Sequence, residues 1–231
     1  MEVLTEKEYH TYHTENVVPT KLKIDSELFV KEISKFNFAP WGDVHLEFPR
    51  YAIPLINEDG IFKKDDPACY PLDRWNFLLE YPQFKYKEWT EEHLIKWKEW
   101  NSQEIDMDSI VNEKHFKVPT DALKISSLSA LSKLSPYMYR SCILKWDYLG
   151  HFKKHIDTWH PTQWIRLWGT TNPDGMVLRY EKNSTMVREH NIEQGRLYLH
   201  DSIKPHEALA FTDDVYQFFI ALNPRALEVL W

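Results

Sequence analysis

The stretch from Arg140 to Asp157, RSCILKWDYLGHFKKHID, joins an apolar run to a glycine-containing turn and ends in His155-Ile-Asp157. Alternate residues of an extended chain share a face, so the side chains of His155 and Asp157 are expected on the same side. His206, at the end of the segment Asp201-Ser-Ile-Lys-Pro-His206, supplies a second imidazole. Two imidazoles and one carboxylate form the three-ligand face that holds non-haem Fe(II) and leaves adjacent positions open. The sequence therefore predicts a metal site, provided that the fold brings these segments together.

The H-x-D triplet is weak evidence by itself. With eleven histidines in the chain, a composition of this kind supplies roughly one such triplet by accident. The alternative is an exposed His155 and Asp157 at the end of a strand, with no metal between them. The sequence around the triplet has to decide between the two interpretations.

The sequence after about residue 138 predicts a mainly β structure. Short runs rich in β-branched and aromatic residues alternate with turns such as Asn172-Pro-Asp-Gly175 and Thr212-Asp-Asp214. This spacing is typical of a β-sandwich or barrel and not of a parallel α/β sheet. In a jelly roll, the segments that carry His155 and His206 can lie side by side at one mouth. The predicted strands are 142–149, 163–171, 176–180, 185–189, 196–200, 207–212 and 215–222.

The sequence before about residue 137 is dominated by helical patterns. Ser26 is expected to cap a helix that ends near Phe36, and Thr90 is expected to cap a second helix over residues 91–101. Pro119-Thr-Asp121 is expected to open a third helix, and one strand is expected over residues 51–56. The expected buried faces carry Phe29, Ile33 and Phe36 in the first helix, Leu94, Ile95 and Trp97 in the second, and Leu128, Leu131 and Leu134 in the third.

The composition excludes several classes of protein. The chain has 231 residues, a formal net charge of −7, and 15% aromatic residues. The negative charge argues against a general nucleic-acid or anionic membrane surface, and no apolar run approaches the roughly 18 residues of a membrane span. Cys69 and Cys142 form neither a disulfide framework nor a zinc pattern, and the acidic, polar N-terminus is unlike a signal peptide. We therefore expect a cytoplasmic protein. The oligomeric state cannot be read from these features.

Three segments together form a more specific pattern. The first is 140–157, with its arginine, apolar strand, glycine-containing turn and H-x-D. The second is Trp164-Ile-Arg166-Leu-Trp-Gly-Thr-Thr-Asn-Pro173, and the third is Gly195-Arg-Leu-Tyr-Leu-His-Asp201-Ser-Ile-Lys-Pro-His206-Glu-Ala. The pattern resembles the aspartyl/asparaginyl β-hydroxylase and bacterial proline hydroxylase branch of the 2-oxoglutarate/Fe(II) oxygenases. The resemblance extends over about residues 140–223 and favours His206 over His200 as the third ligand.

The resemblance implies that His155, Asp157 and His206 hold Fe(II), with 2-oxoglutarate and O₂ as co-substrates. The expected reaction is hydroxylation of an unactivated C–H bond in an amino acid, a peptide or a related small carboxylate. Asp157 favours hydroxylation over halogenation, because halogenases of this kind have a small residue at this position.

The expected fold belongs to the α+β class with a mainly β core. Residues 1–231 are expected to form a single domain. Within it, residues 1–137 would be a mainly helical N-terminal support region. Residues 138–231 would be a double-stranded β-helix, of the jelly-roll or cupin-like type, that forms the catalytic core.

One position departs from the pattern of the family. About ten residues after the distal histidine, the family usually has an arginine that pairs with the far carboxylate of 2-oxoglutarate, and this chain has Tyr216. Arginine binds a carboxylate through two parallel hydrogen bonds, whereas tyrosine offers one uncharged donor. Arg166 and Arg179 are candidates to replace it, and Tyr148 is a candidate for a further hydrogen-bond donor to the co-substrate. The alternative for each arginine is a side chain that faces solvent.

Arg140, Arg50 and Trp168 are candidates for substrate binding. An arginine near the metal suits the carboxylate of an amino acid or peptide, although ordinary surface positions are the favoured alternative for both arginines. Trp168, together with Trp159 and Trp164, could wall a pocket. Tryptophans at this density are, however, more often part of a hydrophobic core.

Two other functions remain open on the sequence alone. A cupin-like metalloprotein could use the same triad with another co-substrate or for another reaction, and the tyrosine at position 216 favours this reading. A non-catalytic β-sandwich binding module would need no metal at all.

Overall fold

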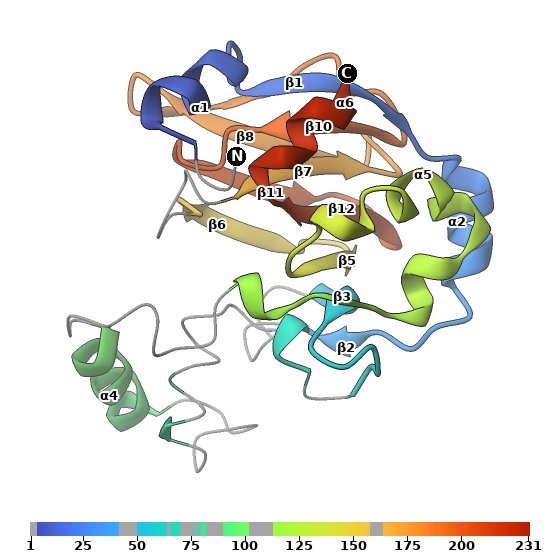
Figure 1. The fold of residues 1–231 in the computed structure, drawn as a ribbon. Helices are drawn as coiled ribbons and strands as arrows, with labels where there is room; N and C mark the ends of the chain where they lie inside the picture. Colours follow the sequence, from blue (N-terminus) through green and yellow to red (C-terminus); the bar gives the residue numbers. More distant parts are fainter. Residues whose placement is uncertain are drawn as a thin grey trace.

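The computed structural model contains two antiparallel β-sheets, and the helix α2 (Ser26–Ile33) and the turns of residues 121–134 pack against the larger one (Figure 1). Over the described residues, no helix combines the length and the apolar character needed to cross a membrane. The structure describes residues 4–41, 50–63, 66–69, 77, 80–81, 90–101, 113–157 and 164–231.

The larger sheet combines strands from both halves of the chain. Its order is β1-β10-β7-β12-β5-β3-β2, and β4 pairs with the last residues of β3. In Figure 1 the blue β1 runs beside the orange β10, so an N-terminal strand extends a sheet built from the C-terminal half. Its strands are β1 (Val17–Lys23), β2 (Ala39–Pro40), β3 (Arg50–Asn57), β4 (Val118–Pro119), β5 (Ser141–Trp146), β7 (Ile165–Thr170), β10 (Arg196–His200) and β12 (Val215–Leu222).

The smaller sheet has the order β6-β11-β8-β9. From β5 onward the chain passes back and forth between the sheets, so that β5 to β12 form two four-stranded sets, β10-β7-β12-β5 and β6-β11-β8-β9. This is the pairing of a double-stranded β-helix, the eight-stranded jelly roll. The expected α+β, mainly β jelly-roll fold is therefore confirmed. The strands of the smaller sheet are β6 (His151–His155), β8 (Met176–Lys182), β9 (Thr185–Arg188) and β11 (His206–Ala210).

The core consists of two hydrophobic clusters, one on each face of the larger sheet. On the outer face, Phe29 from α2 (Ser26–Ile33) packs against Phe218 of β12 with their ring centroids 5.0 Å apart. On the inner face, Trp146, Trp168 and Tyr180 fill the space between the two sheets. Because successive residues of a strand face opposite sides, the longer strands β1, β3, β5, β7, β10 and β12 each contribute residues to both clusters.

The first two predicted helices are present with small differences. Asp25, and not Ser26, caps α2, because the Asp25 side chain accepts a hydrogen bond from the Leu28 N–H. The helix ends at Ile33, before Phe36. The second predicted helix is α4 (Glu91–Asn101). Its Ile95 is half exposed and not buried as predicted. The Leu94 side chain lies outside the described part of the structure.

The third predicted helix is wrong as a continuous α-helix. The segment forms 3₁₀ turns and one short helix, α5 (Ser129–Ser132). Leu128, Leu131 and Leu134 are buried as predicted, but their three-residue spacing matches the 3₁₀ period and not the α period of 3.6. Among the described elements the other helices are α1 (Glu6–Tyr12) and α6 (Leu227–Leu230), and the 3₁₀ turns are Pro67–Cys69, Glu113–His115, Asp121–Lys124, Ser126–Leu128, Ser135–Tyr137 and Pro224–Ala226.

Candidate metal centre

The two histidines of the predicted triad lie opposite each other on neighbouring strands. His155 is the last residue of β6 and pairs with His206, the first residue of β11. Their ring centroids are 4.3 Å apart. Between Phe152, which pairs with Ala208, and His155, strand β6 contains one more residue than β11 does. This extra residue is a β-bulge, and it lets Phe152 and His155 both line the same pocket.

The strand β6 is the one core strand that the sequence analysis did not predict. Its sequence HFKKH places two exposed lysines, Lys153 and Lys154, between Phe152 and His155. The bulge therefore removes the alternation of polar and apolar residues on which the recognition of a strand depends.

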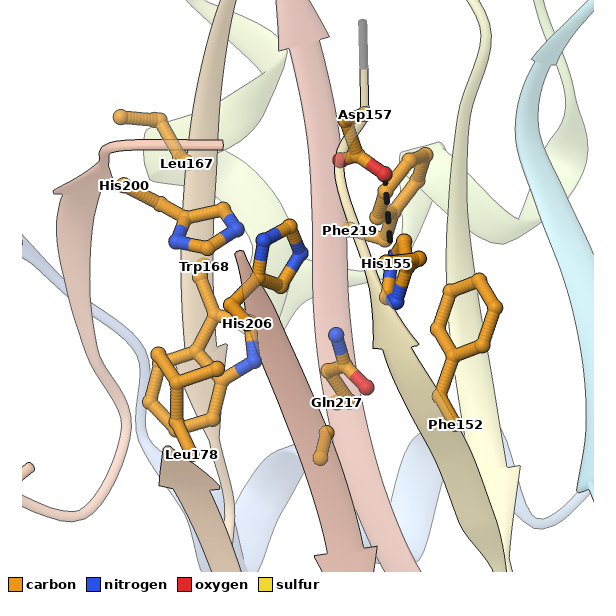
Figure 2. Close-up of a pocket in the computed structure, with 11 residues that line it drawn as sticks. Phe152, His155, Asp157, Leu167, Trp168, Leu178, His200, His206, Gln217 and Phe219 are labelled. Carbon is orange, nitrogen blue, oxygen red and sulfur yellow. Dashed lines mark ion pairs between the residues drawn. The ribbon is translucent and has the colours of Figure 1, made fainter. Parts of the chain in front are cut away.

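Asp157 completes the group two residues beyond the end of β6. One potential ligand atom from each of His155, Asp157 and His206 lies within 4.8 Å of the others, and Asp157 Oδ1 is 3.3 Å from His155 Nε2. The Asp157 N–H donates to the carbonyl of Ser202 at 2.9 Å, so the loop before β11 holds the backbone of Asp157 in place. Figure 2 shows the carboxylate and the two imidazoles gathered at one end of the pocket. The structure thus brings the three predicted ligands together.

Both imidazoles keep their Nε2 atoms available for a metal. The His155 Nδ1–H donates to the carbonyl of Lys153 at 2.7 Å, and the His206 Nδ1–H donates to that of Lys204 at 2.9 Å. A ring that donates from Nδ1 has a lone pair on Nε2, and such a hydrogen bond also orients the ring. His155 Nε2 is buried without a hydrogen-bond partner among the described residues. Two imidazole nitrogens and one carboxylate oxygen are a donor set that fits Fe(II).

The surroundings also favour the protonation states that a metal requires. Burial would raise the pKa of Asp157, but the adjacent His155 ring and the electrostatic effects of His206 and Arg166 hold it well below its usual range. Burial lowers the pKa of His206, and the neighbouring Asp157 opposes this effect only in part. At neutral pH the carboxylate is therefore ionised and the His206 ring is neutral, as ligation demands.

A pocket lies beside the triad, between the two sheets. It contains about 340 Å³ of space, part of which is open to solvent. Figure 2 shows Trp168 of β7 and Gln217 and Phe219 of β12 facing this space from the larger sheet, with Leu178 of β8 and Phe152 of β6 on the other side. The walls of this pocket are therefore mainly apolar and aromatic.

His200, the weaker candidate for third ligand, also lines this pocket. Its ring lies edge-on to that of His206, with the centroids 4.5 Å apart, and its Nδ1 is hydrogen-bonded to the Tyr180 hydroxyl. Burial holds the pKa of His200 well below its usual range, so the ring is neutral. The group of three converging ligand atoms contains His206 and not His200.

Arg166 lies beside the triad, but its guanidinium already contacts two carboxylates of the chain. It donates two hydrogen bonds to Glu113, at 3.0 and 3.3 Å, and its Nε is 3.6 Å from Asp157 Oδ2. Burial would lower the pKa of Arg166, but Glu113 and Asp157 raise it. Arg140, predicted to bind substrate, contacts the same Glu113 through Nε at 3.3 Å. The pocket lining includes neither arginine.

The structure separates Arg179 and Tyr148 from the triad. Arg179 pairs across the strands with Glu207, whose neighbours His206 and Ala208 line the pocket. The Arg179 side chain therefore lies on the outer face of the smaller sheet, where it forms an ion pair with Glu207 at 2.5 Å. Tyr148 is 56% exposed in the turn between β5 and β6, at the opposite end of β6 from His155. Neither position is suited to contact a co-substrate.

Tyr216 also faces away from the pocket, contrary to its predicted role. Its ring lies in the outer cluster, with its centroid 5.6 Å from that of Phe29. The residue of β12 that faces the pocket at this level is the next one, Gln217. Counting residues from the distal histidine leads to Tyr216, whereas the neighbouring residue faces the pocket, because one residue along a strand reverses the direction of the side chain.

The other two predicted substrate residues lie near the triad. Trp168 lines the pocket. Arg50, at the start of β3, is 3% exposed, and its Cζ is 4.5 Å from the ring centroid of Phe152. The Phe152 ring in turn stacks on His155 with a centroid distance of 3.8 Å. Trp159, also considered as a pocket wall, lies outside the described residues.

Sequence reasoning missed Glu113, Phe152 and Gln217. Glu113 lies in a short 3₁₀ turn without a recognisable pattern, so its contact with Arg166 could not be inferred. Gln217 could have been found, because a polar residue within the apolar run 215–222 is unusual at a buried position.

No family model and no curated protein matches this sequence. Among solved structures, the chain is similar to an oxidoreductase of the 2OG-Fe(II) oxygenase family from Burkholderia pseudomallei, with 9% sequence identity and a TM-score of 0.45 over 95% of this chain and 91% of that chain. It is also similar to KdgF from Halomonas sp., with 13% identity and a TM-score of 0.28 over 40% of this chain and 74% of that chain. The fold assignment above rests on the strand pairing itself.

Proposed function

We propose that this chain is an Fe(II)- and 2-oxoglutarate-dependent dioxygenase that hydroxylates an unactivated C–H bond of an amino acid, a peptide or a related small carboxylate. The observation that carries this proposal is the convergence of His155, Asp157 and His206 at one end of a double-stranded β-helix, beside a pocket. Three protein ligands leave room at the metal for both a co-substrate and O₂.

The residues around the triad have roles that follow from their positions. His155, Asp157 and His206 would hold the iron, and bound Fe(II) with 2-oxoglutarate would supply the oxidising chemistry. Phe152, Trp168 and Phe219 would keep water away from the reacting groups. Trp168, as a wall of the pocket, would also contact the substrate.

Arg50 is the described arginine best suited to bind a substrate carboxylate. Its Nε and Nη1 are buried without a hydrogen-bond partner among the described residues, whereas Arg140 and Arg166 contact Glu113. Burial lowers the pKa of Arg50 to about 9, so it is still charged at neutral pH. A buried charge without a partner is unfavourable. The carboxylate of a ligand would compensate the charge of Arg50 if the ligand displaced the Phe152 ring from the face of the guanidinium.

Replacing Arg50 with glutamine is therefore expected to weaken binding of a carboxylate substrate by about 10- to 100-fold, the range that corresponds to a charged hydrogen bond. Isothermal titration would measure the dissociation constant for the acid and for its neutral amide. The amide should bind both proteins equally. Arg179→Gln, which removes a charge from the outer face of the smaller sheet, is the matched control. Equal affinity of the acid for Arg50→Gln and for the wild type would rule out this role.

The proposed reaction is tested by succinate release across free amino acids and short peptides, in the presence of Fe(II), 2-oxoglutarate and O₂. We expect turnover that one class of carboxylate stimulates and that Asp157→Ala abolishes. A protein that binds iron but releases no succinate with any of these compounds would contradict the proposal.

A jelly-roll metalloprotein with a different co-substrate is the second candidate function. The observation in its favour is that the described residues lining the pocket include no arginine or lysine, and Gln217 faces the pocket instead. Anaerobic addition of Fe(II) and 2-oxoglutarate distinguishes the two. A weak visible charge-transfer band is expected for the dioxygenase, whereas iron binding without this band would favour the second candidate. A chain that binds no iron would favour a non-catalytic binding module.

A further inference from the structure

The two carboxylate oxygens of Asp157 have different partners. Oδ1 lies 3.3 Å from His155 Nε2, on the side of the two imidazoles. Oδ2 lies 3.6 Å from Arg166 Nε, on the side of the larger sheet. A carboxylate can rotate about its last side-chain bond, which exchanges the positions of its two equivalent oxygens. A cation on one side holds one oxygen there, so the other oxygen faces the opposite side.

The guanidinium of Arg166 is itself held in a fixed orientation. Its two terminal nitrogens donate to the two oxygens of Glu113, at 3.0 and 3.3 Å, in the bidentate geometry that gives strong and directional pairs. Its Cζ is 4.9 Å from the ring centroid of Phe219. The side chains of Arg166 and Glu113 are each only 5% exposed, so water competes little for these contacts.

Glu113 is fixed from a second direction. The Arg140 N–H donates to the Glu113 carbonyl at 3.3 Å, and Arg140 Nε is 3.3 Å from Glu113 Oε1. Four charged side chains therefore lie in a row with alternating sign, in the order Arg140, Glu113, Arg166 and Asp157. The row joins a turn of the N-terminal half to the start of β5, to β7 and to the segment after β6. Removing one member would leave a buried charge without its partner.

We infer that Arg166 and Glu113 are positioning residues for Asp157, which hold its Oδ1 toward the two imidazoles and thereby set the affinity and geometry of the metal site. This inference rests on the proposed metal site. Arg166 acts through Asp157 and Glu113 acts through Arg166. Neither residue is needed to contact the metal, and both act before any co-substrate binds.

Cobalt(II) binding tests this role without any need for turnover. Co(II) is titrated into wild-type protein, Arg166→Lys, Arg166→Met and Glu113→Gln, and the dissociation constant and the visible absorption spectrum are recorded. We expect Arg166→Met to weaken binding by about 10- to 100-fold, the range for loss of a partner of a metal ligand, and to change the spectrum. Arg166→Lys should bind Co(II) more tightly than Arg166→Met does, because lysine keeps the positive charge. It should still bind more weakly than the wild type, because lysine cannot donate the two parallel hydrogen bonds of the guanidinium.

The matched control is Arg179→Met, which breaks another arginine–carboxylate pair on the outer face of the smaller sheet. It should keep the wild-type affinity and spectrum, even if it lowers stability. Should Arg166→Met fail to fold, Arg166→Lys and Glu113→Gln decide the question by the same two readouts. Wild-type affinity and spectrum in the folded Arg166 and Glu113 variants would overturn the inference and leave the metal site intact. A wild-type protein that binds no Co(II) would overturn the metal site itself, and the inference with it.

Discussion

Replacing His206 with alanine is expected to lower the affinity for Fe(II) by more than about 100-fold, because loss of an outer partner of a metal ligand already reduces affinity 10- to 100-fold. His206 supplies one of the three ligand atoms within 4.8 Å of one another, and the other two come from His155 and Asp157. An anaerobic Fe(II) titration against a chromophoric chelator would measure the change.

His151→Ala is the matched control for this experiment. His151 lies on the same strand as His155 but on the outer face of the smaller sheet, where its Nε2 is hydrogen-bonded to Glu207 at 3.0 Å. We expect its loss to leave the iron affinity unchanged. Iron binding by His206→Ala that equals the wild type would show that the metal, if bound, is held elsewhere.

Replacing Phe218 with alanine is expected to lower the free energy of unfolding by about 3–5 kcal/mol, the range for removal of a large buried aromatic side chain. Phe218 is 0% exposed and packs against Phe29 of α2. Urea denaturation monitored by tryptophan fluorescence would measure the change. Because Phe218 faces away from the pocket, the folded variant should bind metal as the wild type does.

A substitution on the outermost strand of the smaller sheet provides the comparison for Phe218→Ala. Val187 of β9 is 41% exposed, and its replacement by alanine should change stability by no more than about 0.5 kcal/mol. A loss below about 1 kcal/mol for Phe218→Ala would contradict the packing of α2 on the larger sheet.

The strands with clear apolar runs could be predicted from the sequence, and the bulged one could not. β7 and β12 are buried along most of their length, so their apolar residues mark them plainly. β6 has exposed lysines at its centre, and it is a strand only because β11 pairs with it. The triad could still be predicted, since the H-x-D spacing and the distal histidine do not depend on recognising β6 as a strand.

The roles of the arginines could not be predicted, because they depend on partners that are distant in the sequence. Arg166 and Arg179 both lie in strands, yet one faces a buried glutamate from the N-terminal half and the other faces the outer surface. Which face a strand residue occupies depends on register, and Tyr216 lies on the outer face while its neighbour Gln217 lines the pocket. Burial and pairing decide such roles, and neither is visible in a single sequence.

The β-bulge in β6 makes the metal site dependent on a residue count and not only on residue identity. Deleting either Lys153 or Lys154 removes no predicted ligand, and it changes only an exposed lysine. Yet it would restore regular pairing with β11 and turn either Phe152 or His155 to the outside of the smaller sheet. A family of related chains could therefore lose or regain this metal site through a single codon deletion or insertion, while every ligand, and most of the fold, remained present in the sequence.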